Sequence, residues 1–399
     1  MFSLRVPEKA QSADDFVNSV GVNVHLMLWR SVYGDFPAVE KALRDLGVLH
    51  IRDGLVDTTW APYYERLNEL GKLGIKSTLI TSPNETDEVI AGYPHRVPDS
   101  FEAYEAPNEY DQSHDPNWAA TLNAFLIRLH AAVKSDPTSA HFPIVGPSLT
   151  RAGSFSKMAE SARLFDYANL HNYLGGRNPG TAGWGANGYG SLAWNLALVD
   201  DAWPNKCIIT TETGYQNDPS NPQGVPEDVS GKYLPRLLFE QWMDGIQRTY
   251  LYQLLDHEKR GRDPGSSFGL LHADFTPKVG YRATQGLLQL LTDPGPPFKL
   301  DDLNLGLFGN LVNVHHVLLE KRNRSFYLAL WVEQPSYDVN AKIYLHVPAQ
   351  QVAIHTGQKM KMEMHELDDQ GLMHTTNLGR TQKQVIAICD RVTVLELSR

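Results

Sequence analysis

The sequence predicts an α/β fold, in which a closed (β/α)₈ barrel of the TIM type precedes a smaller β-sandwich domain. Eight short runs rich in β-branched and apolar residues alternate with stretches of helical period over roughly the first 290 residues. Eight such strand–helix units in this length match the size of the barrel. After a proline-rich stretch only strand patterns follow. We therefore expect the barrel at residues 1–292 and the sandwich at residues 298–399.

The predicted barrel strands are the eight runs at 19–28, 47–54, 74–82, 100–109, 142–150, 165–173, 205–215 and 246–256. Between them, stretches such as 35–47 and 117–136 place apolar residues at i, i+3, i+4 and i+7, as an amphipathic helix does. An open doubly wound sheet is the competing arrangement. Eight units would be many for such a sheet, and no G-x-G-x-x-G follows the first strand.

The predicted sandwich begins after a linker, "LTDPGPPFKL", in which two prolines flank a glycine and a third proline follows. Alternating strand patterns separated by polar turns then occur at 311–321, 325–333, 341–348, 350–357 and 391–398. The N-terminal "LRVPEK" could add a strand to this domain. We expect a structural role for the sandwich, because it has no evident row of exposed aromatic residues.

Composition and charge exclude several classes of protein. The 399 residues carry a formal net charge of −10 with no run rich in lysine or arginine, so no nucleic-acid partner is expected. Cys207 and Cys389 lack the CxxC spacing of a metal or redox site, and we expect neither a metal nor a cofactor. No signal-peptide pattern and no run of about 18 apolar residues occur, so no membrane span is expected. We expect a soluble protein, either cytoplasmic or secreted with its signal peptide missing from this sequence, of undetermined oligomeric state.

The ends of the predicted barrel strands carry the candidate functional residues, because active sites of this fold lie at the C-terminal ends of the strands. Two carboxylates are prominent there: Glu109 ends the fourth strand and Glu212 ends the seventh. Strands four and seven lie nearly opposite each other, so the two glutamates could face each other across a pocket. That geometry suits glycoside hydrolysis, in which one carboxyl protonates the leaving oxygen and the other attacks the anomeric carbon. Asn108, beside Glu109, could hydrogen-bond a sugar hydroxyl.

The segments "APNEY" and "TTETGY" resemble those of the clan of retaining (β/α)₈ glycoside hydrolases, in which an Asn-Glu pair supplies the acid/base and a later Glu is the nucleophile. The resemblance implies Glu109 as acid/base and Glu212 as nucleophile, with His171 and Tyr173 near the nucleophile. A barrel followed by a small sandwich looks most like family 39, and less like families 5, 30 and 79. The eighth strand departs from the clan, since "YLYQLLDHE" stands where many members carry a tryptophan that floors the sugar site.

Other strand-end residues have both a binding and a structural interpretation. Arg52 could hold the nucleophile carboxylate or form an interior ion pair with Glu105. His25 could contact a sugar hydroxyl or pack at its strand end. His171 and Tyr173 alternate on one face, where Tyr173 would orient Glu212 or both side chains would pack in the core. Further candidates for substrate binding are Gln253, near the end of the eighth strand, and Trp184, in the glycine-rich segment 174–190. This segment suits either a lid over a sugar or an irregular surface loop.

The sequence thus predicts a retaining glycoside hydrolase acting on a β-linked carbohydrate. A transglycosylase or an inverting hydrolase at the same site is one alternative, and a carbohydrate-binding barrel without catalytic activity is another. The sugar, the linkage, and the choice between exo and endo attack depend on loops, which single-sequence patterns do not determine.

Overall fold

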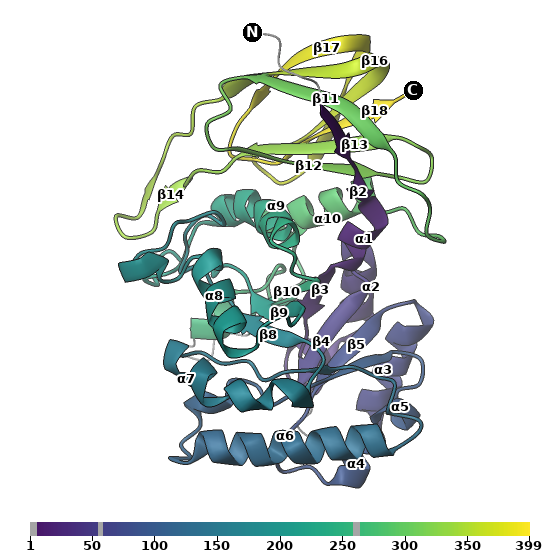
Figure 1. Ribbon diagram of the computed structural model, residues 1–399, viewed down its shortest axis with the longest axis vertical. Helices are drawn as coiled ribbons and strands as arrows, with labels where there is room; N and C mark the ends of the chain where they lie inside the picture. Colours follow the sequence, from purple (N-terminus) through teal and green to yellow (C-terminus); the bar gives the residue numbers. More distant parts are fainter. Residues whose placement is uncertain (1–5, 55–58, 258–263) are drawn as a thin grey trace.

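The computed structural model describes residues 6–54, 59–257 and 264–399, and its lower half in Figure 1 is a barrel of parallel strands. The barrel strands have the order β7-β6-β5-β4-β3-β10-β9-β8, with all neighbours parallel. A parallel bridge between Val145 and Tyr167 joins the two ends of this order and closes the barrel. All eight predicted strands are confirmed: β3 (Val20–Asn23), β4 (His50–Gly54), β5 (Lys76–Ile80), β6 (Phe101–Glu105), β7 (Ile144–Val145), β8 (Ala168–His171), β9 (Ile208–Thr213) and β10 (Arg248–Leu251).

Helices surround the barrel where the sequence has helical period. In α2 (Phe36–Leu46), Asp35 caps the first turn by accepting from the backbone N–H of Ala38, and Gly47 ends the helix with φ 85°. The other helices are α1 (Ala13–Asn18), α3 (Ala61–Lys72), α4 (Asp87–Ala91), α5 (Tyr93–Arg96), α6 (Trp118–Ser135), α7 (Ala152–Lys157), α8 (Leu192–Ala202), α9 (Glu227–Met243) and α10 (Val279–Leu291). Short 3₁₀ turns are η1 (Val32–Gly34), η2 (Tyr110–Gln112), η3 (Ala159–Leu164), η4 (Ala186–Gly188) and η5 (Pro264–Ser267).

The second domain is a mostly antiparallel sheet that folds over its own core. Its order is β1-β11-β16-β18-β13-β12-β2, and β17 pairs with β16. The long strand β16 pairs with β11 through its first part and with β18 through its second, so one continuous sheet forms both layers. Its strands are β1 (Val6–Lys9), β2 (Gln11–Ser12), β11 (Asp302–Gly309), β12 (Val314–Glu320), β13 (Phe326–Val332), β16 (Gln350–Leu367), β17 (Met373–Ile388) and β18 (Thr393–Ser398).

Two details of this domain differ from the sequence patterns. The expected strand at 341–348 is reduced to β15 (Ile343–Tyr344), which pairs only with β14 (Tyr337–Asp338). Both β15 residues are exposed, so in this hairpin only Tyr337 of β14 reaches the core. The strand expected at 350–357 continues to Leu367, and β11 and β17 were not among the expected strands.

The sheet domain and the barrel share a hydrophobic core. Strand β13 is buried on both faces: Leu328 and Leu330 lie in the core of the sheet, whereas Trp331 lies in the core of the barrel. The Trp331 ring stacks on Phe239 of α9 with centroids 5.4 Å apart. Figure 1 shows α9 and α10 between the barrel strands and the sheet. The sheet is therefore a fixed support for this side of the barrel.

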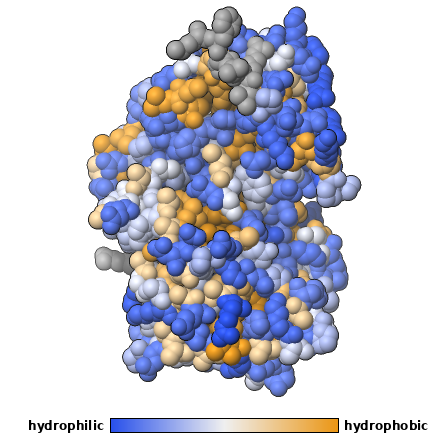
Figure 2. Space-filling model, viewed as in Figure 1, coloured by the Kyte–Doolittle hydropathy of each residue, from blue (hydrophilic) through white to orange (hydrophobic). Residues whose placement is uncertain are grey.

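The surface is largely polar. Figure 2 shows hydrophilic residues over most of the visible face, with hydrophobic residues in small groups between them. Within the described ranges, no helix has the length and apolar character needed to cross a membrane.

Candidate active site

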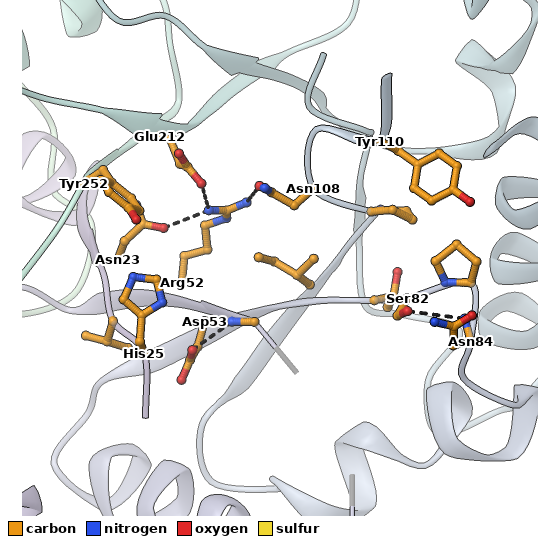
Figure 3. Close-up of a pocket in the computed structure, with 16 residues that line it drawn as sticks. Asn23, His25, Arg52, Asp53, Ser82, Asn84, Asn108, Tyr110, Glu212 and Tyr252 are labelled. Atoms are coloured by element: carbon orange, nitrogen blue, oxygen red, sulfur yellow. Dashed lines mark hydrogen bonds and ion pairs between the residues drawn. The ribbon is translucent and has the colours of Figure 1, made fainter. Parts of the chain in front are cut away.

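The C-terminal ends of the barrel strands surround a cavity of about 420 Å³. Figure 3 shows Arg52 near its centre, with hydrogen bonds to Asn23, Asn108 and Glu212. Polar and aromatic side chains line it together, as in a ligand-binding pocket. Its lining residues are Asn23, Val24, His25, Arg52, Asp53, Gly54, Ile80, Thr81, Ser82, Pro83, Asn84, Pro107, Asn108, Tyr110, Glu212 and Tyr252.

Arg52 organises the floor of the cavity from the end of β4. Its Nε and Nη2 donate to the two carboxylate oxygens of Glu105 at 2.7 and 2.8 Å, a bidentate pair inside the barrel. Its Nη1 donates to Glu212 Oε1 at 2.6 Å and to Asn23 Oδ1 at 2.9 Å, and Nη2 also donates to Asn108 Oδ1 at 2.7 Å. All five N–H groups of the guanidinium have acceptors. Both sequence interpretations of Arg52 hold, since it pairs with Glu105 and also binds Glu212.

Glu212, on β9, is kept ionised by its neighbours. Its side chain is 11% exposed, and Tyr173 Oη donates to its Oε2 at 2.9 Å. Burial alone would raise the pKa of this carboxyl, but the charges of His171 and Arg52 and the hydrogen bonds from Arg52 and Tyr173 lower that pKa below its usual value. Burial raises the pKa of Tyr173 well above its ordinary range, so its hydroxyl remains a donor. Glu212 therefore has the charge state of a nucleophile.

Glu109 lies in more open surroundings. Its side chain is 27% exposed, and Gln112 Nε2 donates to its Oε2 at 3.0 Å. Its backbone is in the left-handed region with φ 43°, and its N–H donates to Ser148 Oγ at 2.9 Å. A non-glycine residue in this region is strained and requires support from its surroundings. The strand thus ends in a turn that directs the Glu109 carboxylate towards β8.

His171, at the end of β8, stands between the two glutamates. Its Nδ1 is 2.8 Å from Glu109 Oε1 and 3.6 Å from Glu212 Oε2. Its Nε2 is 3.0 Å from the hydroxyl of Thr211, which itself donates to Asn169 Oδ1 at 2.7 Å. Because the Thr211 proton is used in that bond, the hydroxyl accepts from Nε2–H of His171. The ring is thereby oriented so that Nδ1 meets Glu109, and it fixes the Glu109 carboxylate beside Glu212.

His25 lines the cavity, whereas Gln253 lies behind it. Burial and the neighbouring His257 lower the pKa of His25 to about 4, so the ring is neutral at neutral pH. The Gln253 side chain is fully buried and hydrogen-bonds His25. Gln253 thus lies beneath His25, whereas its neighbour Tyr252 lines the cavity directly.

Trp184 does not line this cavity. The guanidinium of Arg177 lies 4.3 Å from the centre of its ring, and its edge meets Tyr189. A Cβ on Gly190, whose φ is 83°, would collide with the indole, so glycine allows the segment to close around Trp184. In this structure the tryptophan packs within its own segment rather than over the carboxylates.

Several residues of the site were not singled out from the sequence. Asn23 accepts a hydrogen bond from Arg52. Asn169 and Thr211 both hydrogen-bond Glu105, and Thr211 also contacts His171. Asn169 precedes His171 by two residues, so strand alternation alone could have placed both on the interior face. Thr211 carries no comparable signal, because the register between β8 and β9 shifts there.

The two glutamates and His171 also have the composition of a metal site. One ligand atom from each lies within 4.8 Å of the others. Both Glu212 oxygens, however, already accept from Arg52 and Tyr173, and the guanidinium is 2.6 Å from one of them. A cation at Glu212 would therefore face an adjacent positive charge. The residues fit proton transfer and nucleophilic attack better than metal binding.

Solved structures share this architecture. A family 39 glycoside hydrolase from the gut symbiont Bacteroides cellulosilyticus WH2 is similar with a TM-score of 0.65 and 15% identity, over 96% of this chain and 82% of that one. A monomeric β-xylosidase from Caulobacter crescentus CB15 has a TM-score of 0.62 and 14% identity, over 99% and 98% of the two chains. A glucosidase from Croceicoccus marinus has a TM-score of 0.60 and 11% identity, over 90% and 92%.

Sequence comparisons add nothing to these likenesses, since no family model and no curated protein matches the chain. The likenesses show that the chain has the fold of family 39 glycoside hydrolases, a TIM barrel with an attached sheet domain. The predicted fold, and the resemblance in architecture, are confirmed.

Proposed function

We propose that the protein is a retaining glycoside hydrolase that cleaves a β-linked carbohydrate, with Glu109 as general acid/base and Glu212 as nucleophile. The observation that carries the proposal is the pairing of two neighbouring carboxylates with different surroundings, of which Glu212 lines the cavity. One oxygen of Glu109 and one of Glu212 lie within 4.8 Å of each other, and Glu212 is held ionised while Glu109 is more exposed and contacts His171 Nδ1. The fold shared with glycoside hydrolases supports the same conclusion.

In the first step Glu212 attacks the anomeric carbon as Glu109 donates a proton to the leaving oxygen. The bond from carbon to the leaving oxygen breaks, and a covalent glycosyl–Glu212 ester forms. Arg52 holds Glu212 Oε1 and Tyr173 holds Oε2, so the carboxylate is oriented before the substrate arrives.

In the second step Glu109, now ionised, removes a proton from water, and the water oxygen attacks the anomeric carbon. Glu212 leaves as the carboxylate, which Arg52 stabilises by charge. Two displacements at one carbon retain the configuration of the sugar. Asn108 is suited to contact a sugar hydroxyl, because its Oδ1 accepts from Arg52 and its position on the cavity wall is thereby fixed.

An inverting hydrolase is less compatible with this geometry. Inverting enzymes separate their carboxyls by roughly 6.5–9.5 Å to admit a water between nucleophile site and sugar. One oxygen of Glu109 and one of Glu212 lie within 4.8 Å of each other, which favours the closer carboxyl spacing of about 5–5.5 Å in retaining enzymes. A binding protein without activity would need neither the orientation of Glu212 nor the contact between His171 and Glu109. A transglycosylase would use the same first step and would differ only in the molecule that accepts the glycosyl group from Glu212.

The proposal is tested with 4-nitrophenyl β-D-glycosides, beginning with the xyloside and the glucoside, on wild type and on Glu212→Ala with added azide. We expect wild type to turn over at least one of them and Glu212→Ala to be inactive. Azide should restore activity to the variant and yield the α-glycosyl azide, since azide attacks from the face that Glu212 vacates.

The matched control is Glu227→Ala, at a glutamate in the first turn of α9 outside the cavity, which should keep wild-type activity. A Glu212→Ala enzyme as active as wild type would refute the nucleophile assignment. Inactivity of wild type on every aryl glycoside and on unlabelled glycans would refute hydrolysis.

A further inference from the structure

Part of the cavity extends beyond the residues that the proposed reaction uses. Figure 3 shows Ser82, Asn84 and Tyr110 grouped together, away from His25, Tyr252 and Glu212. We call this part the distal arm, and define it by the lining residues Thr81, Ser82, Pro83, Asn84 and Tyr110.

The distal arm has the chemistry of a sugar site. Ser82 and Asn84 bring a hydroxyl and an amide, which can donate and accept hydrogen bonds, and Tyr110 brings an aromatic ring with a hydroxyl. Sugars present hydroxyls at their edges and C–H groups on their faces. A polar wall beside an aromatic ring matches both kinds of surface.

The backbone of the distal arm is held in place. Thr81 donates from its N–H and its hydroxyl to the Glu105 carbonyl at 2.8 and 2.7 Å, which ties the end of β5 to the end of β6. The Asn84 N–H donates to Ser82 Oγ at 3.3 Å, and the Ser82 N–H donates to Glu85 Oε2 at 3.2 Å. A preformed turn binds a ligand without a large ordering cost.

The distal arm lies in the cavity that Glu212 also lines, whereas the residues that line this cavity do not include Glu109. In the barrel order, β5 is one neighbour of β6, and β7 and then β8 follow on the other side. The Glu109 carboxylate is directed to His171 on β8, whereas the arm begins at Thr81 after β5. The leaving group must lie against Glu109 to receive its proton. The arm is thus on the side of the sugar that stays bonded to Glu212.

The size of the whole cavity, about 420 Å³, falls in the range of pockets that bind small molecules. We propose that the distal arm is a second sugar-binding subsite on the glycone side of the cleaved bond, so that the preferred substrate carries at least two β-linked sugars on that side. This inference rests on the proposed function and adds the substrate class.

The test compares an aryl monoglycoside with an aryl diglycoside of the same sugar: 4-nitrophenyl β-xyloside with 4-nitrophenyl β-xylobioside, and the glucoside with the cellobioside. Wild type should have the higher kcat/KM on the diglycoside and release a disaccharide from it. Asn84→Ala should lower kcat/KM on the diglycoside roughly fivefold, the value of one neutral hydrogen bond, and leave the monoglycoside unchanged. Tyr110→Ala should lower kcat/KM on the diglycoside further, mainly by raising KM.

The matched control is Asn377→Ala, at an exposed asparagine on β17 of the sheet domain. This variant should leave kcat/KM unchanged on both the monoglycoside and the diglycoside. If Asn84→Ala and Tyr110→Ala lower kcat/KM equally on the monoglycoside and the diglycoside, or lower it on neither, the proposed subsite is refuted. The proposed hydrolytic activity would not be affected by that result.

Calorimetric titration with xylose, xylobiose, glucose and cellobiose tests the arm independently of turnover. Tighter binding of a disaccharide than of its monosaccharide, reduced by Asn84→Ala, supports the subsite even if no aryl glycoside is cleaved. Equal binding of both lengths overturns it.

Discussion

At the scale of single residues, the site separates two identical side chains by their neighbours. Glu212 has Arg52, His171 and Tyr173 around it and a pKa below the usual value. Glu109 is more exposed, and its carboxylate contacts the imidazole of His171 and the amide of Gln112. Two carboxyls in such different environments can take the roles of nucleophile and acid.

The first prediction concerns the Tyr173 hydroxyl. Since that hydrogen bond lowers the pKa of Glu212, Tyr173→Phe should raise this pKa. Activity requires ionised Glu212 and is lost as pH falls through its pKa. The acid limb of kcat/KM should therefore move to higher pH, by up to about one pH unit for one hydrogen bond. Tyr189→Phe, at an exposed tyrosine outside the cavity, should leave the limb in place.

The second prediction concerns the proton donor. Glu109→Ala should slow cleavage of 4-nitrophenyl glycosides by about 10²–10⁴-fold, the usual contribution of a general acid or base. Glycosides with 2,4-dinitrophenol as leaving group need little protonation of the leaving oxygen. The variant should therefore cleave them in the first step at a rate much closer to that of wild type. The decrease in rate caused by Glu109→Ala is measured over a series of aryl glycosides with different phenols. A decrease that grows steadily with the pKa of the phenol supports Glu109 as the general acid. The same loss for every leaving group would contradict it.

At the scale of elements, loops that follow different strands hold the site together. Asp111, just after Glu109, is 2% exposed and accepts from the backbone N–H groups of Thr150 and Arg151 at 3.0 and 3.1 Å. It also accepts from the Thr150 hydroxyl. This joins the loop after β6 to the loop after β7, where Ser148 holds the Glu109 backbone.

The third prediction is that Asp111→Ala lowers kcat more than it raises KM, because Glu109 loses its fixed position. It should also lower the free energy of unfolding by about 1–3 kcal/mol, since buried donors are left without an acceptor. Asp111→Asn keeps one acceptor oxygen and should recover part of both losses. Stability is measured by urea unfolding and activity on an aryl glycoside. A destabilised variant with unchanged kcat would show that the loop does not position Glu109.

Much of the barrel and part of the site could be predicted from the sequence, because strand position decides where a side chain points. The eight strands and the interior Arg52–Glu105 pair follow from apolar runs and period-two alternation. The orientation of Trp184 does not follow from them, since glycines such as Gly190 let the segment turn back on itself. The 18-residue length of β16 does not follow from them either, because this strand pairs with two separate partners, β11 and β18.

At the scale of the whole molecule, the sheet domain supports the wall of the barrel next to the site. Arg236 of α9 and Glu333, just after β13, form a buried ion pair, with Nε donating to Oε2 at 2.8 Å. Glu333 Oε1 also accepts from the Asn178 side chain and the Gly180 N–H at 2.8 Å each. One sheet residue thus holds both a barrel helix and the glycine-rich segment 174–190.

The fourth prediction is that Glu333→Ala destabilises the protein by about 3–5 kcal/mol, because it leaves the buried Arg236 charge without its partner. Thermal and urea unfolding should both show the loss as one cooperative transition, since the two domains share a core. The control is Lys41→Ala, which breaks an exposed ion pair with Asp45 on α2 and should leave stability unchanged. Two separate transitions in wild type would contradict a shared core.

The most direct test of the central claim is to trap the glycosyl–enzyme intermediate. Wild type is incubated with 2,4-dinitrophenyl 2-deoxy-2-fluoro-β-glycosides, whose fluorine slows hydrolysis of the covalent ester, and is then digested and mapped by mass spectrometry. We expect one added fluorosugar, attached to Glu212, and no label in Glu212→Ala. A label on another residue of an active enzyme would contradict Glu212 as the nucleophile, and turnover of ordinary aryl glycosides with inverted product and no label would contradict the retaining mechanism.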